Sequence, residues 1–312
     1  MVVCQNGSSV TRVLAVLVFQ SVTLVWAPAR CPAAYEGCLV DSRAEAIGDC
    51  WCLSSFPALS MAPLPPPDGG FAFDLSYRRP FGLSDLEEKN AAVNVPLSWC
   101  LASLGFIERG GGLYRERALS ATVSAAVRRA TPGRTSPTAA GGMPARAAPD
   151  RTRDAPASPV SVSVSLTAFE VSVEGWRPAR CASLSAGARA SPVSSVDVCV
   201  GLGNIMSSDN RLGLRQTFLA GVVLRPHPVV SLAAEVRRQP GEKSSFHLGA
   251  ELEPYGGAYL RCGLRTEPME LTVGFGIALE GLGLDTASSF HPILGRTDSF
   301  SLSFSRRARG AE

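Results

Sequence analysis

One alternation of side-chain size constrains the fold of this chain more than any other feature. In residues 271 to 279 the odd positions carry large apolar side chains, whereas the even positions carry Thr, Gly, Gly and Ala. A period of two is typical of a β-strand with two different faces. Because glycine weakens an ordinary strand, the small face must meet something other than a packed hydrophobic core.

The same alternation recurs through the second half of the chain. It is found in residues 217–225, 229–237, 246–253, 258–265 and 300–304. Turn signals rich in Pro and Gly separate these segments, which are short enough to be single strands. A series of short strands joined by turns predicts an antiparallel meander.

The first half of the chain shows a weaker form of the pattern. Four stretches alternate in the same way: 71–77, 93–107, 117–128 and 160–173. A phase slip at Ala168 and Phe169 is expected to be a β-bulge. The intervening residues 129–159 are rich in Pro, Ala, Arg and Thr, a composition that cannot bury a core and that predicts a long mobile loop.

Two architectures fit such a meander, and periodicity alone does not separate them. A soluble sandwich buries its apolar face, whereas an outer-membrane barrel turns that face to lipid and its polar face to an aqueous lumen. Charged residues on the small face favour the barrel, since they suit a crowded polar interior and closure leaves no unpaired edge. The predicted fold class is therefore all-β, an antiparallel outer-membrane β-barrel of about 12 to 14 strands. An exported soluble β-sandwich that binds a ligand or partner remains the alternative.

The barrel prediction identifies candidate lumen-facing residues. They are Glu235, Arg237, His247, Glu251, Arg261, Arg265 and Asp285. Acidic groups on 246–253 are expected to face basic groups on 258–265 across a hairpin, because unlike charges on neighbouring strands attract. His247, with Glu251 and Glu253, is expected to belong to a solvated lumen cluster.

The N-terminus predicts export. Arg12 is followed by an apolar run over residues 13–26 and then by Ala27-Pro28-Ala29, which fits a signal-peptide cleavage site. The run of about 14 apolar residues is shorter than the roughly 20 that a spanning helix needs. We therefore expect a signal peptide at 1–29 and an outer-membrane location, with membrane lipid as a partner.

The cysteines indicate no metal centre and no cofactor. The chain has nine of them, and the Cys50-Trp51-Cys52 spacing is too tight for a usual zinc pair. An oxidising compartment would allow a disulfide among Cys31, Cys38, Cys50 and Cys52. The remaining cysteines within strand-like runs, Cys100, Cys181, Cys199 and Cys262, are expected to be small buried apolar residues.

Neither catalysis nor nucleic-acid binding is favoured. His227, His247 and His291 fall in unrelated places, and the chain contains no G-x-S-x-G motif, so we expect no enzyme. The net charge of +3 is small and evenly spread, which argues against a nucleic-acid partner.

Two segments carry a resemblance to a known family. Residues 43–64, RAEAIGDCWCLSSFPALSMAPL, and the closing stretch that ends GRTDSFSLSFS at 305 resemble PorV/PorQ-type and FadL-like outer-membrane proteins, and the resemblance extends over 43–305. It implies a barrel with an N-terminal plug, acting in transport of hydrophobic or small molecules or with a partner in a protein-secretion complex. The implied organisation is a signal peptide (1–29), a plug-like segment (30–70), a barrel (71–305) and a tail (306–312).

Overall fold

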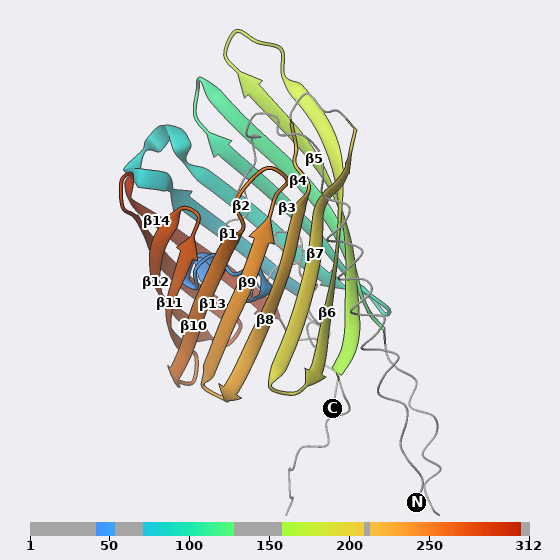
Figure 1. Cartoon of the computed structure of the whole chain (residues 1–312), viewed down its shortest axis with the longest axis vertical. Helices are drawn as coiled ribbons and strands as arrows, with labels where there is room; N and C mark the ends of the chain where they lie inside the picture. The colour runs from blue at the N-terminus through green and yellow to red at the C-terminus, as the bar shows by residue number, and fades with distance from the viewer. Residues whose placement is uncertain (1–41, 54–70, 128–157, 209–212, 307–312) are drawn as a thin grey trace, which may run out of the picture.

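In the computed structural model the chain forms a closed barrel of fourteen antiparallel strands (Figure 1). The structure describes residues 42–53, 71–127, 158–208 and 213–306. Each strand pairs with its neighbours in the chain, and the ring closes where β1 pairs with β14, for example Phe73 opposite Phe304. This closure contradicts the alternative of a two-sheet sandwich.

The strands follow one another in an up-and-down meander. Their bounds are β1 Phe71–Arg79, β2 Glu88–Pro96, β3 Leu101–Gly110, β4 Tyr114–Val127, β5 Ser158–Val173, β6 Ala179–Val193, β7 Val196–Ser207, β8 Thr217–His227, β9 Val230–Arg238, β10 Ser245–Tyr255, β11 Ala258–Thr266, β12 Met269–Leu279, β13 Leu282–His291 and β14 Gly295–Arg306. The helical elements are α2 Ser42–Ala46 and the 3-10 turns η1 Trp51–Leu53, η2 Pro80–Gly82 and η3 Ser84–Leu86. None of the helices in these described ranges is long and apolar enough to cross a membrane.

The large apolar side chains of the alternating segments point outward. On β12, Leu271, Val273 and Phe275 are 54%, 42% and 41% exposed, whereas Thr272 between them is 3% exposed. Neighbouring strands continue the band, with Leu248 and Leu260 also exposed. The predicted division of these strands into an apolar outer face and a small or polar inner face is confirmed.

The structure differs from the sequence pattern at two places in the first half. The alternating stretch 93–107 belongs to two strands, because β2 ends at Pro96 and a turn precedes β3. Pro lacks the N–H that would continue the ladder. The phase slip at Phe169 is not a bulge, since its pairing with Cys181 is regular and the register shift lies between Ser158 and Ser161.

Phe169 breaks the apparent alternation because a large side chain points inward there. It packs with Ala72 against the buried inward residues Ala92, Ile107 and Ala118. The inner wall formed by β1 to β5 therefore carries an apolar cluster among its polar residues.

Several predicted features lie outside the described residues. They are the signal peptide at 1–29, the loop at 129–159 except its last two residues, the tail after residue 306, and the parts of the plug-like segment before residue 42 and after residue 53. Cys31 and Cys38, two members of the predicted disulfide group, also lie outside them.

Candidate functional site within the barrel

Residues 42–53, here called the inner segment, lie inside the ring of strands. α2 contacts β11 to β14, and η1 contacts β8 and β9 (Figure 1). Ala46, Ile47 and Cys50 have no exposed surface. The helix is short because Gly48 and Asp49 take the left-handed conformation, with φ of 76° and 62°, which turns the chain away from the helix axis.

The small inward face of the strands makes room for the inner segment. A Cβ atom on Gly249 would lie 2.3 Å from the Ile47 carbonyl oxygen, and one on Gly263 would lie 2.0 Å from the Gly48 nitrogen. A Cβ atom on Gly274 would lie 2.3 Å from the Ala46 Cβ. All three distances are far shorter than van der Waals contact. Glycine is therefore required at these positions because the backbone of the inner segment touches the backbone of the wall.

Side chains of the wall satisfy the backbone of the turn that follows α2. The Thr272 hydroxyl donates to the Ala46 carbonyl oxygen at 3.1 Å and accepts from the Gly48 N–H at 2.9 Å. His247 Nδ1 donates to the Gly48 carbonyl oxygen at 2.7 Å. His247 is 1% exposed, so the expectation that it belongs to a solvated cluster is wrong; it is buried beneath the inner segment.

An ion-pair chain holds the start of the inner segment. Arg43 binds Glu251 through two hydrogen bonds of 2.7 and 2.9 Å, and Glu251 also accepts one of 2.6 Å from Arg261 Nε. Arg261 in turn pairs with Asp285 on β13. Glu251 and Arg261 are direct partners across the β10–β11 hairpin, so the predicted facing of acidic and basic groups is present.

A second ion cluster holds the end of the inner segment. Arg237 Nη1 lies 2.8 Å from Asp49 Oδ2, and the Arg237 guanidinium stacks on the Trp51 ring with its Cζ 3.6 Å from the ring centre. Arg265 Nη1 is 3.7 Å from the same carboxylate. Burial alone favours a neutral Asp49, but the charges of Arg237 and its neighbours outweigh burial and lower the pKa of Asp49 to about 2. Glu235 completes the cluster by accepting the Cys52 N–H at 2.9 Å.

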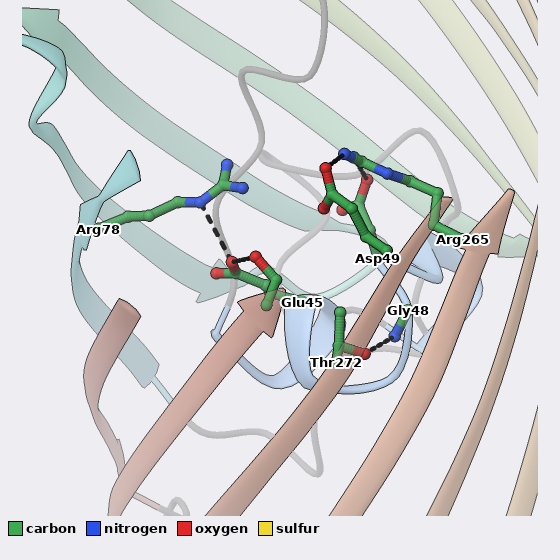
Figure 2. Close-up of a pocket in the computed structure, with 8 residues that line it drawn as sticks. Glu45, Gly48, Asp49, Arg78, Arg265 and Thr272 are labelled. Atoms are coloured by element: carbon green, nitrogen blue, oxygen red, sulfur yellow. Dashed lines mark hydrogen bonds and ion pairs between the residues drawn. The ribbon is translucent and has the colours of Figure 1, made fainter. Parts of the chain in front are cut away.

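Beside Asp49 and Arg265 the wall and the inner segment leave a small polar cavity, which is also lined by Glu45, Arg78 and Thr272 (Figure 2). Its volume of about 20 Å³ has room for about one water molecule. Glu45 points into it, with Arg78 Nε at 3.2 Å and the Ser289 hydroxyl at 3.3 Å from Glu45 Oε1. Burial raises the pKa of Glu45, and the charge of Arg78 opposes that rise only in part.

An apolar patch of the wall covers the other side of the inner segment. Leu219 and Val223 on β8, 0% and 1% exposed, pack with Ile47 and Trp51. These two residues alternate with the outward apolar side chains of β8, so both faces of this strand are apolar. Sequence reasoning missed the patch because it assigned the interior to the polar and small positions.

All seven predicted lumen-facing residues lie around the inner segment. Five contact it directly, namely Glu235, Arg237, His247, Glu251 and Arg265, and Arg261 and Asp285 extend the ion-pair chain from Glu251. Sequence reasoning did not single out Thr272 or Arg78. Thr272 had a visible signal, since it is the one hydroxyl among the small residues of its strand.

Cys50, Cys52, Cys100, Cys199 and Cys262 are free thiols, and Cys262 is exposed on the outer face rather than buried. Within the described ranges no group of three or more His, Cys, Asp or Glu side chains is arranged to hold a metal ion.

Comparison with known proteins shows likeness of fold alone. No protein-family model matches the sequence, and no curated protein matches it. Among solved structures, the CymD monoaromatic hydrocarbon channel is 10% identical and covers 78% of this chain and 88% of its own, with a TM-score of 0.50. Omp33 of Acinetobacter baumannii is 9% identical over 76% of this chain and 99% of its own, with a TM-score of 0.47. The toluene transporter TbuX of Ralstonia pickettii is 10% identical over 88% of this chain and 94% of its own, with a TM-score of 0.46. The chain has the fold of an outer-membrane β-barrel.

Proposed function

We propose that this protein is an exported outer-membrane channel for small molecules, and that the inner segment is its plug. The observation that carries the proposal is the docking of residues 42–53 against the inner wall of a closed barrel. Both ends of the segment are held by ion pairs, through Arg43 to Glu251 and through Asp49 to Arg237.

The outer surface supports a place in the membrane. Apolar side chains cover successive strands outside, whereas charged and hydroxyl side chains face inward. In water such a surface would be a large aggregation hazard, but in a bilayer it matches the hydrocarbon core. The strands of nine to sixteen residues are long enough to cross it when tilted.

The plug role is supported by how the inner segment is held. Besides the apolar patch on β8, its contacts are polar and directional, and they come from several strands of the wall. Breaking a buried ion pair is costly when one charge is left dry, but displacement of the segment would expose both partners to water and so reduce that cost. The arrangement therefore suits a segment that stays docked at rest and can be displaced.

The apolar cluster of the opposite wall favours small hydrophobic molecules as cargo. Ile107 and Ala118 point inward there together with Phe169, although most inward residues of the barrel are polar. CymD, whose fold this barrel resembles, is a channel for monoaromatic hydrocarbons. We propose cargo of that general size and polarity.

The resemblance to PorV/PorQ-type and FadL-like proteins stays a prediction. So does a role with a partner in a protein-secretion complex, which no observation in the described part of the chain favours over transport.

The location is tested by cell fractionation with electrophoresis before and after boiling. An assembled outer-membrane barrel should sediment with outer membranes and change mobility on heating. Recovery in the soluble periplasmic fraction, with no change on boiling, would contradict the membrane location.

The channel and plug are tested by solute uptake into liposomes that contain the refolded barrel. The double variant Arg43→Gln with Asp49→Asn removes a charge at each end of the plug and should admit solutes faster than the parent. Arg296→Gln is the matched control, because it removes an exposed ion pair with Asp298 that is remote from the plug. Equal uptake by the double variant and the control would count against the plug.

A further inference from the structure

Three buried thiols meet beside Trp51 of the inner segment. Cys50 and Cys52 of the inner segment share one apolar cluster with Cys199, which points inward from β7. They are 0%, 1% and 2% exposed. These three thiol groups belong neither to the ion pairs that hold the inner segment nor to the lining of the polar cavity.

The backbone of Cys52 is fixed from two sides. Its N–H donates to Glu235 Oε2 on β9 at 2.9 Å, and its carbonyl oxygen accepts from Arg189 Nη1 on β6 at 3.4 Å. The two bonds hold the residue over β7 and β8, which lie between those strands.

Gly221 of β8 shows how close the side chains of Cys52 and Cys199 are. A Cβ atom placed on it would lie 3.1 Å from Cys199 Sγ and 3.3 Å from Cys52 Cβ. The two cysteine side chains therefore converge on one point, and glycine is the residue that leaves them room. A hydrogen bond with the Cys199 thiol, the largest of several influences, lowers the pKa of the Cys52 thiol. The thiolate is the form that attacks disulfides.

We propose that Cys52 and Cys199 are a disulfide-forming pair that fastens the inner segment at residue 52 to the barrel wall. The occurrence of the bond in cells depends on the proposed export, because disulfides persist in oxidising compartments. The ability of the folded barrel to form it does not depend on export.

The bond forms by two exchanges with an oxidant that itself carries a disulfide. The Cys52 thiolate attacks one sulfur of that disulfide, which gives a mixed disulfide and releases one oxidant thiol. The Cys199 thiol then loses its proton and attacks the Cys52 sulfur, which expels the second half of the oxidant as a thiolate that takes up a proton. The two cysteines lose two electrons and two protons, and the oxidant disulfide is reduced to thiols.

The consequence is an inner segment that is fixed to the wall at Cys52. With Cys52 tethered, displacement of the segment is confined to the part from Arg43 to Asp49, which the ion pairs hold. The segment can then open the lumen without leaving the barrel.

The test uses the full mature chain refolded in detergent and treated with oxidised glutathione. Free thiols are then blocked with an alkylating reagent, and proteolytic peptides are analysed by mass spectrometry without reduction. We expect a linked pair of peptides containing Cys52 and Cys199, lighter by two hydrogen atoms than their sum. The link should vanish in Cys199→Ser and persist in Cys50→Ser, the matched control from the same cluster.

Two results would overturn the proposal. One is full alkylation of both cysteines when the oxidised barrel is unfolded before blocking. The other is a link that joins Cys199 to Cys50 instead. Heat-dependent mobility of each variant establishes that the barrel is folded, and cell fractionation decides the proposed location separately.

Discussion

Gly263→Val is expected to drive the plug out of the barrel. The first added carbon would lie 2.0 Å from the Gly48 nitrogen and 2.3 Å from the Ile47 carbonyl carbon, so the inner segment must move by more than an ångström. That movement breaks the two Thr272 hydrogen bonds and the one from His247. Leaving such buried groups unsatisfied costs about 1 to 3 kcal/mol each, so loss of the three hydrogen bonds should weaken docking by roughly 3 to 9 kcal/mol. This corresponds to a change of about a hundredfold to a millionfold in the docking equilibrium.

The assay for this variant is release of a small polar dye from liposomes. Cys262→Val is the control, because it adds bulk to the adjacent residue on the outward face of the same strand. Gly263→Val should release dye much faster than the parent, and Cys262→Val should match the parent. If a folded Gly263→Val barrel retained dye as well as the parent does, the close contact between Gly263 and the plug backbone would be wrong.

Three further predictions concern the membrane face, pH and the lumen. Val273→Arg should impair assembly by about 2 to 4 kcal/mol as judged by heat-dependent mobility, whereas Thr272→Ser keeps the hydroxyl and should assemble normally; equal behaviour would contradict the orientation of β12. Because the pKa of Asp49 falls from 3.8 to about 2 on docking, its charge stabilises the docked state above pH 3.8 by roughly 2 kcal/mol. This contribution is lost as the pH falls through 2, so dye release should rise in acid, and an Asp49→Asn barrel that showed the same rise would exclude this carboxylate as its cause. Cysteines introduced at Glu251 or Arg261 should react slowly with a bulky polar reagent and faster with a small one; rapid reaction with both would place them in open water.

The fold could be predicted from the sequence because its main signal is local. Every second residue of β12 is large and apolar, and the period of two fixes which face each side chain takes regardless of distant contacts. Glu251 opposite Arg261 could also be predicted, since a tight turn sets the register of a hairpin. The closed ring excludes the sandwich because every strand has two partners.

The site was less predictable because it depends on contacts between distant parts of the chain. Gly249 and Gly263 signalled close approach of some backbone, but nothing local identified that backbone as residues 46–48. Leu219 was overlooked and Phe169 was read as a phase slip, because large inward side chains are indistinguishable by type from outward ones. The burial of His247 depends on the inner segment, more than 190 residues away in the chain.

Single-channel conductance in a planar bilayer tests the central claim most directly. Parent barrels and barrels lacking residues 42–53 would be compared after both show the heat-dependent mobility of a folded barrel. Removal of the plug should turn a small conductance into a larger, steady one, because the ion-paired segment no longer occupies the lumen. Equal conductances in the two folded barrels would contradict the claim that residues 42–53 obstruct the channel.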